Sequence, residues 1–395
     1  MNTVLKSIGV NTCRLLVSAV FVFSGIVKLI DPHGTEYRLA DYASALGLSS
    51  LSVEPVPLVL AVALAMTEFC FGIYLLYGIR RRLTTRLILI LLLVFTPLTL
   101  WLAVTDAVED CGCFGDAVHL TNWQTFAKNV VLLAMAVLLC RTRRYQMRLL
   151  SEAVHWVASL FTIIYGILVA LLALWQEPML DFRPYYIGQD MAQAMQWPDD
   201  PMLQPEILDF TIEPIEGLEY GALPTPDIDE ILADTGYTFL LIAPYLDRAD
   251  DANVDDINSI ADFARSNDYR FLCLTASSAP IVRRWQELTG AEYDFAFVDE
   301  LTLKTVMRSN PGLLLLHGSQ IVDKYGNAGL SQFFDAGQEP FHQRYAVIEP
   351  HDERESRHAT TLLLYYVLPL CALMLIDRLV AAVRWWLRRR RASRQ

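Results

Sequence analysis

Residues 83–104 read LTTRLILILLLVFTPLTLWLAV, and the only charged side chain in this stretch is Arg86. An α-helix needs about 20 predominantly apolar residues to cross the hydrocarbon core of a bilayer. Lipid offers backbone N–H and C=O groups no hydrogen-bond partner, so a segment that crosses it must be helical. The stretch therefore predicts a transmembrane helix and indicates that the protein is an integral membrane protein.

Five further stretches of the 395-residue chain, 54% of which is hydrophobic, have the same character: 11–30, 56–79, 124–140, 153–175 and 360–380. The first runs into Lys28 to Pro32 without the small-residue motif of a signal-peptide cleavage site. We therefore predict six spans. The alternative is five spans with a buried sixth apolar segment, which would leave the Arg-rich C-terminal tail outside.

Basic residues gather in alternate connections of this predicted bundle. Lys6 and Arg14 lie before or early in the first span, four arginines lie within 80–86, four within 141–148 and six within 384–394. The connection 31–55 has only Arg38, and the connection 105–122 has no Lys or Arg. Because cytoplasmic loops carry the excess of Lys and Arg, both termini are expected in the cytoplasm and residues 176–358 on the opposite side.

Charge also separates the polar part of the chain from the rest. Residues 176–358 contain 33 acidic and 12 basic side chains, a net charge of −21, although the whole chain has only −12. A polyanionic domain of this kind argues against nucleic acid and against anionic lipid as its ligands.

The polar part divides into a linker and a folded domain. Residues 177–235 are rich in Pro and acidic residues, which favours an extended tether. Residues 236–345 alternate apolar strands with amphipathic helices, which predicts an α/β domain with a mainly parallel sheet. The expected strands are 238–243, 270–275, 294–298 and the hairpin 312–316 and 320–324; the expected helices are 255–267, 279–288 and 301–308.

Pro311 stands immediately before the hairpin, in the order Pro-x-Leu-Leu-Leu-x-x-Gly-x-x-x-Val. This order resembles the C-terminal half of the thioredoxin fold, and the resemblance implies a cis peptide bond at Pro311. The Cys-x-x-Cys of that family should follow the first strand, but residues 244–250 read PYLDRAD. Cys273, the domain's single cysteine, lies inside a predicted buried strand. The domain is therefore expected to dock partners and not to carry redox chemistry of its own.

Two of the seven cysteines, Cys111 and Cys113, lie in a polar loop, EDCGCFGD at 109–116. A disulfide across one intervening residue departs from relaxed geometry, which makes it labile and suits it to exchange. The neighbouring Glu109, Asp110 and Asp116 should oppose thiolate formation. Activation would then come from His119 or from the start of the fourth span, which Thr121 and Asn122 could cap.

Three interpretations of this cysteine pair stay open. The pair could carry thiol–disulfide exchange or an electron relay, or it could be a static bridge that holds the loop. Metal ligation by Cys111, Cys113 and His119 is the weakest, because a closed site needs four ligands and only three are local. We therefore expect no metal.

Lys28 and Glu68 are ionisable residues in or near apolar spans. Such groups usually face the bundle interior or pair with one another. Lys28 could instead extend its ammonium group to the outer interface. A buried ion pair between them is the alternative, and Glu68 could then serve as a proton carrier.

The loop, together with the first-span pattern of Arg14, Gly25 and Lys28 and with Glu68 in the second span, resembles MauE/DoxX-type bacterial membrane proteins over about residues 10–145. The resemblance implies a four-helix, redox-associated core in the inner membrane, with Asp110, Phe114 and Gly115 as structural residues of the loop. MauE is linked to maturation of a disulfide-rich periplasmic enzyme subunit, and DoxX-type relatives to quinone-linked electron transfer. A quinone is thus the only cofactor that the resemblance suggests.

The chain is therefore predicted to be mainly α: a four-helix DoxX/MauE-like membrane domain (1–150), a fifth span (151–176), a periplasmic linker (177–235), a thioredoxin-like domain (236–345), and a sixth span with a cytoplasmic tail (346–395). The first functional hypothesis is a thiol–disulfide oxidoreductase that acts on periplasmic protein thiols or disulfides. The second is a non-enzymatic scaffold or assembly factor with a structural cysteine pair. A transporter is disfavoured, because no span has paired Gly or Pro breaks and Pro97 is an isolated kink.

Overall fold

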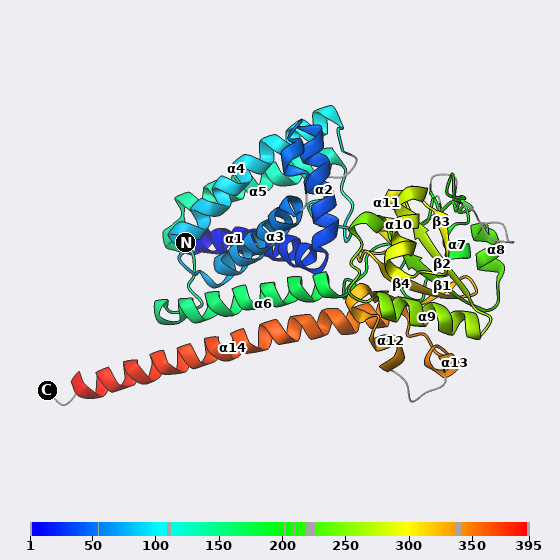
Figure 1. The fold of residues 1–395 in the computed structure, drawn as a ribbon. Coiled ribbons are helices and arrows are strands. Elements are labelled where there is room, and N and C mark those ends of the chain that lie inside the picture. Colours follow the sequence, from blue (N-terminus) through cyan, green and yellow to red (C-terminus); the bar gives the residue numbers. More distant parts are fainter. Residues whose placement is uncertain are drawn as a thin grey trace. The chain divides into compact units, whose positions relative to one another are not determined.

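The structure of the chain, a computed structural model, describes residues 2–53, 55–108, 112–200, 203–208, 210–218, 226–335 and 341–392. These residues form two compact units (Figure 1). Unit 1 comprises Met1–Leu171 and Thr360–Gln395, and unit 2 comprises Leu172–Ala359.

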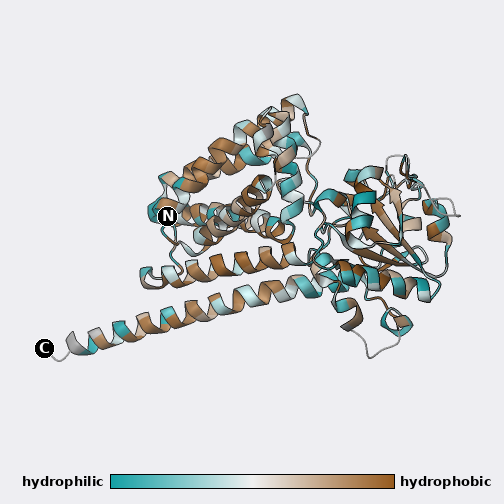
Figure 2. Cartoon of the chain, viewed as in Figure 1, coloured by the Kyte–Doolittle hydropathy of each residue, from teal (hydrophilic) through white to brown (hydrophobic). Residues whose placement is uncertain are grey.

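Unit 1 is helical, and the helix α14 joins it to unit 2. Its elements are α1 (Asn2–Ile30), α2 (Pro32–Ala45), α3 (Val56–Tyr77), α4 (Arg81–Thr105), α5 (Asn122–Arg141), α6 (His155–Trp175) and the greater part of α14 (His351–Ala392). Within the described residues, six helices are long and apolar enough to cross a membrane, all of these except α2. Figure 2 shows apolar residues dominating α4, α6 and the middle of α14. The prediction of six membrane helices is confirmed.

The helix α2 lies in residues 31–55, which were expected only as a connection. Asp31 is its N-cap and accepts a hydrogen bond from the Gly34 N–H, while Pro32 occupies the first turn, where a missing N–H costs nothing. These two residues are a helix-start signal that the search for long apolar stretches does not detect. The helix carries Thr35 and Arg38, which both line the cavity described below.

Close packing of α1 against α3 depends on two glycines. A Cβ atom added to Gly25 would lie 2.6 Å from the Cα of Phe69, and one added to Gly72 would lie 2.7 Å from the backbone nitrogen of Val22. Small residues at helix interfaces let backbones approach in membranes. This approach brings Lys28, at the end of α1, within reach of Glu68 on α3.

Replacing Gly25 with alanine should destabilise unit 1, because the new methyl group meets backbone atoms that cannot move aside. We expect a loss of roughly 1–3 kcal/mol, the usual cost of overpacking. Gly9→Ala in the same helix is the matched control, since a Cβ there has no atom within 4 Å. Thermal unfolding of the two variants in detergent measures the difference, and equal melting temperatures would contradict the packing argument.

Unit 2 is built on a five-stranded sheet with the order β3-β2-β1-β4-β5. Its strands are β1 (Tyr237–Ile242), β2 (Arg270–Thr275), β3 (Asp294–Phe297), β4 (Gly312–His317) and β5 (Gln320–Gly326). The strands β1, β2 and β3 pair in parallel, while β4 runs antiparallel to β1 and β5 antiparallel to β4. The predicted strands and the hairpin are thus confirmed, and the peptide bond between Asn310 and Pro311 is cis.

Both faces of this sheet are buried, as the continuous apolar runs predicted. Phe239 and Leu241 of β1 face one hydrophobic cluster, and Leu240 and Ile242 face another. The predicted helices α9 (Val254–Ser266), α10 (Ala279–Thr289) and α11 (Glu300–Val306) are present. The first cluster includes residues of α9 and α10, and the second includes residues of α11. Four short helices complete the unit: α7 (Met191–Ala194), α8 (Ile228–Ala233), α12 (Gln332–Asp335) and α13 (Phe341–Arg344).

The segment 177–235 is expected as an extended tether, but its described residues pack onto the sheet instead. It forms backbone hydrogen bonds with both outer strands: Met191 N–H donates to the Ser319 carbonyl beside β5, and Glu213 exchanges two hydrogen bonds with Phe297 of β3. Its apolar side chains Tyr185, Ile207 and Phe210 are buried in the second cluster. Composition suggested a tether because proline and acidic residues separate these apolar residues, but an unpaired sheet edge has backbone groups that an irregular segment can satisfy.

Phe210→Ala tests whether this segment is part of the domain. The side chain is 2% exposed and its ring lies 6.0 Å from that of Tyr185, so truncation should cost roughly 3–5 kcal/mol of unfolding free energy. Phe182→Ala, in the same segment but 38% exposed, is the control and should have a much smaller effect. If both variants unfolded like the parent, the segment would be a tether after all.

Candidate functional site

An ion pair is buried in unit 1. The Lys28 Nζ lies 2.7 Å from Glu68 Oε2, and the two side chains are only 6% and 11% exposed. Of the two sequence interpretations, the structure supports pairing inside the bundle and not extension of Lys28 to the interface. Pairing compensates each charge for the free energy of desolvation that its burial alone would cost.

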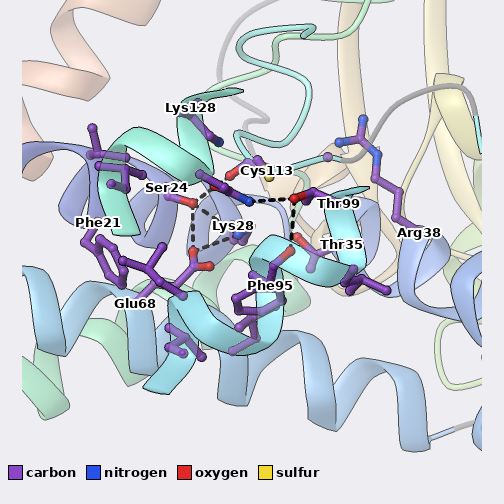
Figure 3. A pocket seen from close by; sticks show the side chains of 18 of the residues that line it. Phe21, Ser24, Lys28, Thr35, Arg38, Glu68, Phe95, Thr99, Cys113 and Lys128 are labelled. Carbon is purple, nitrogen blue, oxygen red and sulfur yellow. Dashed lines mark hydrogen bonds and ion pairs between the residues drawn. The ribbon is translucent and has the colours of Figure 1, made fainter. Parts of the chain in front are cut away.

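Ser24 joins this ion pair to the cysteine loop (Figure 3). Its Oγ lies 2.7 Å from Glu68 Oε2 and 2.6 Å from the backbone carbonyl oxygen of Cys113, and it accepts a hydrogen bond of 3.1 Å from Lys28 Nζ. A hydroxyl has one hydrogen, so Ser24 can donate to the carboxylate or to the carbonyl but not to both at once. It stands one helical turn before Lys28, and that spacing is the signal by which the sequence could have revealed it.

Arg38 of α2 holds the loop from its other side. Its Nη1 donates to the Gly115 carbonyl oxygen at 3.1 Å, and its Nη2 pairs with the Asp116 carboxylate. Gly112 has a positive φ of 63°, and a Cβ atom added to it would lie 3.0 Å from Arg38 Cζ and closer still to other atoms of that side chain. The glycine between the two cysteines therefore makes room for the arginine.

The residues that follow the cysteines are packed against helices. The Phe114 ring makes an edge contact with Phe23 of α1 at 5.4 Å, and Lys128 Nζ of α5 lies 4.1 Å from the Phe114 ring centroid. Gly115 has a φ of 57°, and a Cβ atom there would lie 2.9 Å from Val27 Cγ1. From Gly112 onward, the loop between α4 and α5 is thus fixed to α1, α2 and α5.

The start of α5 is capped as predicted. The Gln124 N–H donates to Thr121 Oγ1, and the Gln124 side chain accepts from the Thr121 N–H, which is a capping box. Asn122 Nδ2 donates to Asp106 Oδ1 and to the Val108 carbonyl, both at 2.9 Å. These bonds close the base of the loop.

Cys111, Asp110 and Glu109 lie outside the described residues, so the predicted pairing of Cys111 with Cys113 stays a prediction. Cys113 is half-buried and His119 is exposed. Cys273 is fully buried in the sheet, and burial raises the pKa of its thiol, in keeping with a packing role. Among the described residues, no group of three or more His, Cys, Asp or Glu side chains could hold a metal ion.

A cavity of about 100 Å³ lies beneath the loop. Its wall includes the polar residues Ser24, Lys28, Thr35, Arg38, Glu68, Thr99, Cys113, Lys128 and Asn129. The rest of its wall is mainly apolar and includes Phe21, Leu64, Leu91, Leu92, Phe95, Leu98 and Leu132. The volume admits water or a very small molecule but is below the roughly 300–1,000 Å³ of pockets that hold drug-sized ligands.

The charges around this cavity modify an expectation from the sequence. Asp116, one of the three loop carboxylates expected to oppose thiolate formation, is paired with Arg38. Lys28, Arg38 and Lys128 all line the cavity together with Cys113. Nearby cations favour a thiolate. The sequence missed Arg38 and Lys128 as site residues, because they come from α2 and α5, which only the fold brings to the loop.

The comparisons with known proteins bear on this unit. The family model "Methylamine utilisation protein MauE" matches residues 6–142, which contain α1 to α5 and the whole site described above. This part of the chain is therefore similar to the MauE family, as the resemblance indicated. No curated protein and no solved structure gives a match.

Removing Lys28 should strand the Glu68 carboxylate in an apolar bundle. Lys28→Met is expected to cost roughly 3–5 kcal/mol of unfolding free energy, whereas Lys28→Met combined with Glu68→Met should recover most of it, because an apolar pair has no charge to compensate. Thermal unfolding of the single and double variants in detergent gives the coupling energy. The control is Lys6→Met, an exposed lysine of the same helix. Additive losses in the double variant would mean that the pair is not coupled.

Proposed function

We propose that this protein carries out thiol–disulfide exchange at the non-cytoplasmic face of a bacterial inner membrane, through Cys111 and Cys113. The observation that carries the proposal is Ser24, which lies within hydrogen-bond distance of both the Cys113 carbonyl oxygen and the Glu68 carboxylate. A group that can take or give a proton therefore stands directly beneath the cysteine loop. Proton transfer of this kind must accompany the redox chemistry of thiols.

A disulfide between Cys111 and Cys113 accepts two electrons and two protons from a partner's dithiol, which becomes a disulfide while the loop becomes a dithiol. Reoxidation passes two electrons and two protons to an acceptor, for which a quinone is the class that the DoxX-type resemblance suggests. The described cavity is small for a quinone ring, so such an acceptor would bind where the loop or the helices open.

The described residues can be given roles in this reaction. Glu68 exchanges a proton with the loop by way of Ser24 or a water molecule, and Lys28 stabilises the carboxylate when the proton has left. Lys128 and Arg38 stabilise a thiolate at Cys113, because both line its cavity. General acid–base groups at hydrogen-bond distance typically contribute a factor of about 10²–10⁴ in rate.

The orientation that this function needs rests on the distribution of arginine. The loop 105–122 has no Lys or Arg, whereas the flanking connections and the C-terminal tail are rich in Arg. Both termini are then cytoplasmic, and residues 176–358 together with the cysteine loop are periplasmic, in a compartment where disulfides form and persist.

Unit 2 is proposed to be a thioredoxin-like domain that docks the partner. Support comes from its strand arrangement, in which two parallel strands, β2 and β1, are followed in the sheet by the antiparallel hairpin of β4 and β5. Residues 244–250, where the redox motif of that family would be, contain no cysteine. The domain would hold a protein whose thiols or disulfides react at the loop of unit 1.

A scaffold or assembly function is the second candidate, and one observation favours it. The described part of the loop, from Gly112 onward, is fixed by Arg38, by Ser24 and by the ring contacts of Phe114. A loop fixed in this way is compatible with a static disulfide bridge as well as with a disulfide that exchanges. The family name refers to methylamine utilisation, and a role in the maturation of a disulfide-rich enzyme would be compatible with either candidate.

Thiol trapping in membranes separates the two candidates. Under the exchange proposal, Cys111 and Cys113 become reduced by mild reductant and reoxidise when it is removed, and Glu68→Gln slows reoxidation by about 100-fold, within the usual range for a proton-transfer group. Ser24→Ala should slow it less, because water can replace a hydroxyl. Ser18→Ala is the control, since this equally buried serine of α1 has no hydrogen-bond partner for its Oγ among the described residues.

Two results would count against exchange. A pair that stays oxidised under strong reductant is a structural bridge, and the scaffold function would then hold. If the pair cycles at an unchanged rate in Glu68→Gln, Glu68 has no role in the mechanism. Cys111 and Cys113 would still be the exchanging pair.

A further inference from the structure

A second and larger cavity lies entirely within unit 2. Its volume is about 410 Å³, within the range of pockets that hold small organic ligands. Its wall is formed by the chain that follows α6, by the end of β5 and by the first two turns of α14. Nothing in the proposed redox function uses it.

The inner face of α14 at this cavity is polar. His351, Arg354, Glu355 and His358 are half-buried and line the cavity, whereas Asp352, Glu353, Ser356 and Arg357 of the same two turns are exposed. A helix that packs on a protein normally turns apolar residues inward. Here the inward side chains are those that can bind a charged group.

The opposite wall is already neutralised. Asp181 pairs with Arg183 at 2.6 Å and with Lys324 at 2.8 Å, and Glu177 pairs with Arg183 at 3.1 Å. Burial alone would raise the pKa of Asp181, but the charges and hydrogen bonds of Arg183 and Lys324 outweigh it and hold the pKa well below its usual range. Glu177, Asp181 and Lys324 line the cavity, and Arg183 pairs with both carboxylates, so these four groups carry no net charge.

Two charged groups on α14 retain binding capacity. Among the residues that the structure describes, the Arg354 guanidinium has no hydrogen-bond or ion-pair partner. Glu355 accepts a hydrogen bond of 2.7 Å from the Asp181 N–H through Oε1, and no described residue donates to its Oε2. The cavity therefore has an anion-binding group and a cation-binding group in adjacent positions of one helix.

We propose that this cavity binds a phosphoethanolamine headgroup, with the phosphate on Arg354 and the ammonium group on Glu355 Oε2. An arginine binds phosphate through several N–H donors, and a carboxylate accepts hydrogen bonds from an ammonium group. A zwitterion fits better than an anion, because the cavity lining has three acidic residues, Glu177, Asp181 and Glu355, and two Lys or Arg residues, Lys324 and Arg354. The negative charge of residues 176–358 would also repel an anionic headgroup.

The position of these residues in the chain favours a membrane lipid over a free metabolite as the source of the headgroup. Gln176, on the cavity wall, directly follows the last residue of α6, and α14 becomes apolar from Leu362 onward. The first two turns of α14 carry too many charges to lie in hydrocarbon. The cavity is thus formed by residues that directly adjoin two candidate membrane spans, where lipid headgroups lie.

The test uses the full chain in lipid nanodiscs that contain phosphatidylethanolamine, phosphatidylcholine and phosphatidylglycerol in equal amounts, with native mass spectrometry of the lipids that the protein retains. We expect preferential retention of phosphatidylethanolamine, because choline has no N–H to donate and glycerol has no cation. Arg354→Gln and Glu355→Gln should each reduce this retention about tenfold, the effect of losing one charge-assisted hydrogen bond. Glu353→Gln, in the same turn but exposed, should leave it unchanged.

Equal retention of the three lipids, or retention that survives both substitutions, would overturn the proposal. Stabilisation of the chain by soluble phosphoethanolamine without lipid retention would overturn the assignment to a lipid and identify a free ligand. If Arg354→Gln does not fold, Glu355→Gln and the lipid preference of the parent chain still decide the question. None of these measurements depends on Cys111 or Cys113, so failure here and failure of the redox function are distinguishable.

Discussion

The ion pair between Lys28 and Glu68 is the constraint on which unit 1 depends. Either charge alone would be costly in an apolar bundle, so the two helices that carry them must pack closely enough to join them. Gly25 and Gly72 permit that approach, because a Cβ atom at either position would collide with backbone atoms of the neighbouring helix. Sequence, helix packing and charge are therefore linked at one point of the bundle.

The same point fixes the cysteine loop. Ser24, one turn from Lys28, lies within hydrogen-bond distance of Glu68 and of the Cys113 carbonyl oxygen, so a change in the loop backbone alters the hydrogen bonding of the carboxylate directly. Arg38 and Phe114 restrict how far the loop can move. A redox change at Cys113 and a proton change at Glu68 would thus be coupled through one hydroxyl group, with no need for large movements of the helices.

Much of this could be predicted from the sequence, for identifiable physical reasons. Long apolar stretches revealed the six spans, continuous apolar runs revealed the buried strands, and ionisable residues in spans indicated the pair Lys28 and Glu68. Arg38, Lys128 and Ser24 were missed, because their roles arise when four separate helices meet. The segment 177–235 was misread, since its widely spaced apolar residues Tyr185, Ile207 and Phe210 have no regular period and are organised only by the sheet they cover.

The two units bury charge in different ways, and the difference bears on function. In unit 2, Asp181 pairs with Arg183 and Lys324, and these two cations keep its carboxylate deprotonated by lowering its pKa. In unit 1, Glu68 has one cationic partner, a hydroxyl that can turn elsewhere, and a cavity beside it. A buried ion pair is often no more stabilising than a well-packed apolar pair. Stability alone therefore does not account for Lys28 and Glu68, whereas exchange of a proton with the loop above them requires an ionisable group at that place.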